Sequence, residues 1–341
     1  MELQIIWFVL WGVLWAVYFM LDGFVLGTGM LHVFLTRDET EKRMSMATVG
    51  PVWDGNEVWL LTAGGATFAA FPTTYALMFS YLYTALLLLL FALIVRGVSL
   101  SFRGEVDGAA WRKGWDVGIL IGSFLPALLL GVAFGNIFRG LPMDAAGHHG
   151  NLLSLLNPYG LVSGVLFVLL FLTHGAIYLS IKTTGALSDR ARTAAIGIWP
   201  LLTAAAVAFL AYTGFATRLY ANYLRVPARL TVPLLAVAAL VAMRVFLAQQ
   251  RMLTAFAASC LTVVLVAATG LVGLFPNLIP SSLDTAYSLT IFNSSSSPYT
   301  LKIMTVVAAI FVPLVIAYKI WVYRLVRARV RPEDVSGAEG Y

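Results

Sequence analysis

The stretch Gly50–Pro72, GPVWDGNEVWLLTAGGATFAAFP, carries two acidic residues into an apolar segment. Asp54 and Glu57 stand near its start, and no basic residue lies within it. A carboxylate inside the hydrocarbon part of a membrane costs roughly 2.5–3.5 kcal/mol on insertion scales, so acidic residues in such segments are rare and usually functional. The surroundings of this stretch therefore decide both the fold and the use of the two acids.

The composition of the chain is that of a membrane protein. Of its 341 residues, 60% are hydrophobic and only 11% are charged, whereas a soluble domain has about 25% charged residues. The mean hydropathy is +0.87. Only helices and closed barrels satisfy their backbone in lipid, and alternating strands of about ten residues are absent from the sequence. We therefore predict an all-α polytopic membrane protein.

Nine apolar runs predict about nine transmembrane helices. They cover approximately residues 5–35, 50–71, 73–98, 113–138, 158–182, 194–217, 229–248, 253–275 and 301–326. Only Pro72 separates the second run from the third. The apolar start of the chain has no basic segment before it, so we expect an uncleaved first span rather than a signal peptide.

The distribution of Lys and Arg predicts the orientation in the membrane, because cytoplasmic loops carry an excess of these residues. With nine spans the termini lie on opposite sides. If the N-terminus is outside, only five of the 22 Lys and Arg residues fall on the outer side, namely Arg139, Arg218, Arg225, Arg229 and Lys302. We therefore predict an outer N-terminus and a cytoplasmic C-terminus. The basic pI near 9.5 then reflects an anionic inner leaflet and not a nucleic-acid partner.

With this orientation, all acids associated with the spans fall on the cytoplasmic side. Asp54 and Glu57 begin the second span, and Asp116 begins the fourth. A helix dipole stabilises an acid at a helix start by about 0.3–1 kcal/mol, which is an ordinary structural explanation for Glu57 and Asp116. It is a weaker explanation for Asp54, and it fails for Asp22, which lies far from any helix start. A buried acid at position 22 needs a partner or a proton, which suits a proton relay.

The inventory of metal ligands is small. The chain has one cysteine, Cys260, and four histidines, of which only His174 lies inside a predicted span. Intramembrane haem chemistry needs several inward ligands on facing helices, and one histidine is more often hydrogen-bonded to a neighbouring helix. We therefore expect this chain to bind no metal or haem by itself. Nucleotide-binding and hydrolase motifs are absent from the sequence.

Several motifs in the first half of the chain form a specific set. They are Asp22-Gly23-Phe24 with Gly27, Trp53-Asp54-Gly55-Asn56-Glu57-Val58-Trp59 with Thr62-Ala63-Gly64-Gly65-Ala66, Trp115-Asp116 with Gly118, Gly122, Ser123 and Pro126, Gly131-Val132-Ala133-Phe134-Gly135-Asn136, Asn157-Pro158-Tyr159-Gly160-Leu161, and His174-Gly175-Ala176 with Tyr178 and Leu179. In these motifs the sequence resembles subunit II of the cytochrome bd quinol oxidases. The motifs are dense over residues 10–182, while the second half matches by helix count and length.

The resemblance implies an architecture and a set of partners. The architecture is two four-helix bundles, in residues 1–138 and 139–275, an outer loop with a peripheral ninth helix in 276–326, and a cytoplasmic tail in 327–341. In that family subunit I carries two b-type haems and one d-type haem and pairs with subunit II by pseudo-twofold symmetry in the bacterial inner membrane. Some members hold a structural quinone in subunit II, and a small single-helix subunit is a further expected partner.

The resemblance also implies residue roles. Asp54 and Asp22 match positions associated with proton delivery to the oxygen-reducing haem, and Trp59 matches a position near an oxygen route. Some relatives have Gln at Glu57, so that acid receives no firm role, although we include it and Asp116 in the expected proton pathway. The function implied is a non-haem subunit of a quinol oxidase that supports assembly and the generation of a proton-motive force. The alternatives are an ion-coupled secondary transporter and a purely structural scaffold.

Two further segments carry expectations. The outer loop Asn277–Tyr299 is polar and rich in Ser, which indicates an ordered cap or a partner surface, with a mobile connector as the alternative. The tail from Arg331 onwards is expected to be solvated and disordered.

Overall fold

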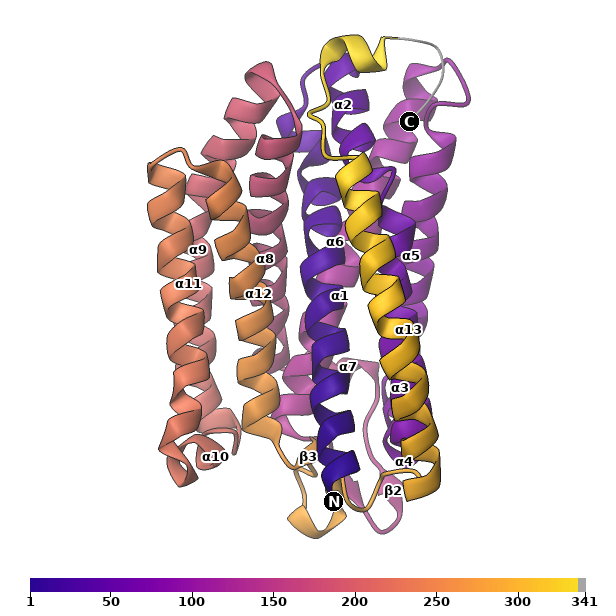
Figure 1. Cartoon of the computed structure of the whole chain (residues 1–341), viewed down its shortest axis with the longest axis vertical. Coiled ribbons are helices and arrows are strands. Elements are labelled where there is room, and N and C mark those ends of the chain that lie inside the picture. Colours follow the sequence, from indigo (N-terminus) through magenta and orange to yellow (C-terminus); the bar gives the residue numbers. More distant parts are fainter. Residues whose placement is uncertain (337–341) are drawn as a thin grey trace.

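The computed structural model describes residues 1–336 and shows a bundle of long helices that run along one axis (Figure 1). The helices are α1 (Glu2–Leu35), α2 (Glu39–Val49), α3 (Trp53–Ala70), α4 (Pro72–Tyr81), α5 (Tyr83–Phe102), α6 (Ala109–Arg139), α7 (Leu152–Leu155), α8 (Pro158–Lys182), α9 (Gly185–Ala216), α10 (Tyr220–Arg225), α11 (Thr231–Ala248), α12 (Met252–Leu274) and α13 (Pro298–Leu325). Two short antiparallel pairs join β1 (Met143–Asp144) to β2 (Gly147–His148) and β3 (Asn277–Ile279) to β4 (Leu289–Thr290). Both pairs lie at the end that holds the N-terminus, and α2 lies at the opposite end, which we call the α2 end.

Eight helices of the described chain are long and apolar enough to cross a membrane, and this confirms an all-α polytopic membrane protein. They are α1, α5, α6, α8, α9, α11 with the preceding turn, α12 and α13. The predicted second span corresponds to α3, which is not among them. Its 18 residues span about 27 Å, and its first turns carry the two acids. The count of nine spans therefore stays a prediction.

Three predicted boundaries differ from the structure. The inner loop expected after the first span contains α2, a polar helix whose Asp38 cap accepts a hydrogen bond from the Glu41 N–H at 2.8 Å. The run 73–98 is covered by two helices, α4 and α5, which meet at Leu82. Helix α9 begins at Gly185 and not at residue 194. A search for apolar runs detects neither a polar helix nor the polar first turns of an apolar one.

Helix α1 is the centre of the bundle and packs against α3, α6, α8 and α12. Its contact with α8 is close because glycines line both sides. A Cβ atom added at Gly27 would lie 1.9 Å from the Phe171 carbonyl oxygen, and one at Gly175 would lie 2.4 Å from the Gly27 carbonyl carbon. These small residues let the backbones of α1 and α8 approach closely. The division into two bundles stays a prediction.

The loop Asn277–Tyr299 is an ordered cap. The Ser294 hydroxyl accepts a hydrogen bond from the Thr74 N–H at 2.9 Å, and the Ser296 N–H donates to the Ala70 carbonyl at 2.8 Å. These contacts fix the loop to the junction of α3 and α4. An ordered cap is one of the two interpretations that the sequence favoured for this loop. The alternative, a mobile connector, is wrong.

The tail was expected to be disordered from residue 331, and this is wrong for its described part. The Val330 N–H donates to the Lys182 carbonyl at 2.7 Å, and a short 3₁₀ helix (Pro332–Val335) packs against α2. The Lys182 ammonium also donates to the Ala328 carbonyl at 2.7 Å. Residues 337–341 lie outside the described part of the chain.

Candidate functional site

Asp22, Glu57 and Arg96 meet between α1, α3 and α5, and we call these three residues the Arg96 cluster. The Arg96 Nη2 atom lies 3.2 Å from both carboxylate oxygens of Asp22 and also donates to Glu57 Oε1. The side chains of Arg96 and Asp22 are 1% and 0% exposed, whereas that of Glu57 is 22% exposed. One buried cation is therefore shared by two carboxylates.

Sequence reasoning missed Arg96 as a site residue and used it only as an inner-side charge for orientation. The signals were present, because Arg96 interrupts the apolar run 73–98 and Asp22 required a partner. What sequence alone does not give is which helix faces Asp22. Close packing of α5 on α6 supplies that placement, since a Cβ atom at Gly122 would lie 2.7 Å from the Arg96 Cβ.

A second polar contact ties the same region to the last helix. Asn56 is fully buried, and its Nδ2 atom donates to the Leu21 carbonyl of α1 at 2.8 Å. Its Oδ1 atom accepts from the Tyr323 hydroxyl of α13 at 2.9 Å, and the Lys319 Nζ atom lies 3.4 Å away. Asn56 therefore links α1, α3 and α13, and Lys319 places a second cation near the acids of α3.

The structure brings Glu57, and not Asp54, into contact with the ion pair of Asp22. Asp54 is exposed, and its Oδ1 atom accepts a hydrogen bond from the Gly55 N–H at 2.6 Å. Within residues 1–336 Asp54 forms no ion pair. Trp59, two residues after Glu57, is 8% exposed and belongs to the main hydrophobic core. The roles expected for Asp54 and Trp59 stay predictions.

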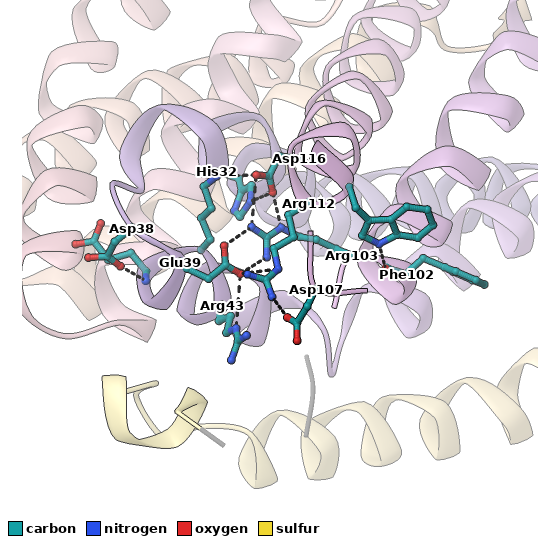
Figure 2. Close-up of polar contacts among 12 residues, drawn as sticks. His32, Asp38, Glu39, Arg43, Phe102, Arg103, Asp107, Arg112 and Asp116 are labelled. Atoms are coloured by element: carbon teal, nitrogen blue, oxygen red, sulfur yellow. Dashed lines mark hydrogen bonds and ion pairs between the residues drawn. The ribbon is translucent and has the colours of Figure 1, made fainter. Parts of the chain in front are cut away.

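Asp116 lies in a separate group at the α2 end, shown in Figure 2, and accepts from three cationic or imidazole side chains. The Lys42 Nζ atom lies 2.7 Å from Asp116 Oδ2, and His32 Nε2 lies 3.0 Å from Oδ1. Arg103 donates to Asp116 and also binds both oxygens of Glu39, at 2.6 and 3.0 Å. We call these five residues the Asp116 cluster.

The Asp116 cluster pairs two acids with the cations Lys42 and Arg103, and further arginines beside it act on Glu39. Burial alone would raise the pKa of the Glu39 carboxyl. Hydrogen bonds and charge from Arg103, together with the charges of Arg112 and Arg43, outweigh burial and hold that pKa below its usual value. Sequence reasoning treated Asp116 as a helix-start acid or a pathway residue and missed the bidentate Arg103, which joins α2 to the end of α5.

His174 has partners on both ring nitrogens. Its Nδ1 atom lies 2.7 Å from the Ser259 hydroxyl of α12, and its Nε2 atom lies 2.9 Å from the Met20 carbonyl of α1. The ring stacks on Phe256 at a centroid distance of 5.0 Å. This confirms the prediction of a histidine hydrogen-bonded to neighbouring helices. With both nitrogens engaged, His174 does not fit the role of a haem ligand. In the part of the chain that is described, no three His, Cys, Asp or Glu side chains group as a metal site.

The family Cytochrome bd terminal oxidase subunit II matches residues 3–326. The chain belongs to this family. Cytochrome bd ubiquinol oxidase subunit 2 of Bacillus subtilis is 39% identical over 336 residues, which cover 98% of each chain. Cytochrome bd-I ubiquinol oxidase subunit 2 of Escherichia coli is 36% identical over 98% of this chain and 97% of that protein.

A solved structure shares the fold. A chain of the bd oxidase from Geobacillus thermodenitrificans superposes with a TM-score of 0.78 at 18% identity, covering 95% of this chain and 98% of that one. Membership of a subunit II family makes this chain one subunit of an oxidoreductase complex and implies a subunit I as partner. Together with its spans and bacterial relatives, it places the chain as a multi-pass protein of the bacterial inner membrane.

Proposed function

We propose that this chain is the haem-free membrane subunit of a quinol:oxygen oxidoreductase. It pairs with a haem-carrying subunit I and helps to deliver cytoplasmic protons to the site where oxygen is reduced to water. Its relatives are named ubiquinol oxidase subunits over nearly their whole length, which supports the reaction class. Because oxygen reduction consumes protons, uptake from the cytoplasm generates a proton-motive force.

The observation that carries this proposal is the sharing of Arg96 by two carboxylates. With both acids ionised, the Arg96 cluster has one negative charge in excess, in a region where Asp22 is fully buried. A single proton bound to either acid makes the cluster neutral. The cluster can therefore accept and release one proton while Arg96 keeps an anionic partner, which is what a relay requires.

The graded exposure of three acids supports a direction of transfer. Asp54 is exposed, Glu57 is partly exposed and Asp22 is sealed. Asp54 and Glu57 are three residues apart on α3, so their side chains lie on one helix face. We assign Asp54 to proton uptake, Glu57 and Asp22 to the inner steps, and Trp59 to the oxygen route. Asp116 serves the cytoplasmic end of the pathway.

The Asp54→Asn variant of the complete two-subunit complex tests this assignment. Asn keeps nearly the shape and hydrogen-bonding reach of Asp but does not titrate. We expect normal haem content in the optical spectrum and a strong fall in quinol-driven oxygen consumption. A wild-type rate with an unchanged pH profile would contradict proton uptake at Asp54, and lost assembly would favour a structural scaffold.

The haem-free role is tested by optical spectra of the purified chain with and without its co-purified subunit I. We expect b- and d-type absorbance only with the partner present. Replacing His174 with Ala should leave the haem spectrum of the complex intact. Stoichiometric haem in the isolated chain would overturn this part of the proposal.

A further inference from the structure

A small cavity lies between the Arg96 cluster and the Asp116 cluster. His32 of the Asp116 cluster and Arg96 of the other cluster both line it, together with Ser123 of α6. The space open to the centre of a water-sized sphere is about 10 Å³, which is close to the volume that one water molecule needs. The two charged groups thus border the same water-sized space.

The residues that line this cavity carry polar atoms in need of partners. His32 Nδ1, Arg96 Nε, Arg96 Nη1 and Ser123 Oγ are buried and have no hydrogen-bond partner among the described residues. His32, Arg96 and Ser123 are each at most 1% exposed. Buried polar groups almost always bind protein or water. The set combines guanidinium donors with a hydroxyl and an imidazole nitrogen that can donate or accept.

The remaining walls of the cavity are mainly apolar. They are formed by Val25, Met46, Val49, Leu100 and Ile119, together with Thr28, Gly29 and Ser45. They come from α1, α2, α5 and α6. A polar site with several partners and apolar walls is the type of cavity that holds a single ordered water molecule.

We propose that this cavity binds a water molecule that bridges Arg96 and His32, and that His32 passes protons from the Asp116 cluster to this water. This inference rests on the proposed proton-delivery function and adds a second, cytoplasmic branch to it. The His32 ring fits the task because Nε2 lies 3.0 Å from Asp116 Oδ1 while Nδ1 belongs to a residue that lines the cavity. The two nitrogens of one imidazole can exchange donor and acceptor roles.

The proton balance of this branch is simple. Asp116 takes up a proton from the cytoplasmic side and gives it to Nε2 of neutral His32, while the Nδ1–H bond of the same ring breaks and its proton goes to the water. The new Nε2–H group then donates to the ionised Asp116 Oδ1, 3.0 Å away. The water passes one proton on to a carboxylate of the Arg96 cluster and is restored. Arg96 stays a cation throughout and positions the water. His32 returns to its first tautomer when its ring rotates and presents a protonated nitrogen to the cavity again.

The first test is a structure of the complete wild-type complex at a resolution that shows internal waters. We expect density for a water within hydrogen-bonding distance of Arg96 Nε and His32 Nδ1. An empty cavity in a map that resolves other buried waters would overturn the site. This measurement needs neither a variant nor turnover, so its outcome is independent of the proposed function.

The second test is the His32→Gln variant of the complex. Gln can still donate to Asp116 but cannot transfer a proton through its side chain, so we expect oxygen consumption to fall by at least about tenfold with unchanged haem content. The matched control is His174→Gln, which replaces an equally buried histidine that does not line the cavity and should keep the wild-type rate.

A wild-type rate of oxygen consumption in His32→Gln would overturn the relay. If Asp54→Asn is slow in the same assay, the proposed function stands and only this branch fails. Lost assembly of His32→Gln together with an empty wild-type cavity would also overturn the inference.

Discussion

The Arg96 cluster and the Asp116 cluster use the same residue types on neighbouring helices but differ in charge balance and exposure. In the first, two carboxylates share one guanidinium, and Asp22 and Arg96 are sealed from solvent. In the second, Asp116 and Glu39 meet Arg103 and Lys42, and the Glu39 side chain is 35% exposed. The Arg96 cluster therefore has one acid in excess, whereas the acids and cations of the Asp116 cluster balance.

This difference separates a buried site that holds a proton from a more exposed group that also ties helices together. A buried excess of acid is costly unless a proton or a cation balances it, so the Arg96 cluster has a built-in reason to bind a proton. In the Asp116 cluster Asp116 already has Lys42, Arg103 and His32 as partners, which come from α2, the end of α5 and α1. Its ion pairs hold four helices at the α2 end, and solvent screens them in part.

The largest effect is expected from removing the buried cation. Arg96→Met leaves Asp22 and Glu57 without a partner, and breaking a buried ion pair in this way costs about 3–5 kcal/mol. Arg103→Met is the matched control, because Asp116 keeps Lys42 and His32 and Glu39 keeps solvent. We expect little or no assembled complex for Arg96→Met and a reduced but measurable yield for Arg103→Met, measured as haem-loaded complex per cell mass. Equal yields would show that the two clusters do not differ in this way.

The next effect is on turnover. Asp22→Asn leaves Arg96 paired with Glu57, so charge balance is kept and the complex should assemble. Because the deepest titrating group is lost, we expect oxygen consumption to fall by about tenfold or more. Glu39→Gln removes an acid of the Asp116 cluster and should change the rate of oxygen consumption little. A slow Glu39→Gln complex, or an active Asp22→Asn complex, would reverse the roles that we give to the clusters.

A smaller effect concerns the pH dependence of stability at the Asp116 cluster. The folded-state pKa of Glu39 is lowered, so its ion pairs stabilise the protein above the unfolded pKa, about 4.3, and this is lost as the pH falls through the folded value. We expect Glu39→Gln to lower the free energy of unfolding by at most about 1 kcal/mol near neutral pH. The difference in Tm from wild type should stay constant down to about pH 5 and shrink below about pH 4. A difference that grows on acidification would contradict the lowered pKa.

The apolar runs predicted the long helices well, because length and composition alone decide which segments can span a membrane. They did not predict α2 or the break at Leu82, since both depend on caps and on packing at the ends of helices. The motif that includes Asp54 and Glu57 located the polar region of α3. It ranked Asp54 above Glu57, whereas the described contacts join Glu57 to Asp22.

The partners of the acids were beyond the sequence for a physical reason. Arg96, Arg103 and Lys319 were counted only as inner-side charges, because a one-dimensional count does not show which helix faces which. Burial of Arg96 and Arg103 depends on the approach of α5 to α6 across small residues such as Gly118 and Gly122. Even without these three residues, the predicted inner side carries more Lys and Arg than the predicted outer side.

The last prediction concerns the side of the membrane on which both clusters open, and it uses substitutions with the smallest expected effect on the enzyme. In a Cys260→Ala background, Asp189→Cys places a thiol on an exposed residue near the start of α9, at the α2 end, and Ser282→Cys places one on an exposed residue of the loop Asn277–Tyr299, at the opposite end. Neither residue touches either cluster, so we expect both variants to keep the wild-type rate. An impermeant thiol reagent added to intact cells should label position 282, and position 189 only after the membrane is opened, because the excess of Lys and Arg predicts that the α2 end lies inside. The opposite pattern would put Asp54 and the Asp116 cluster on the outer side, and protons consumed there would not support cytoplasmic uptake.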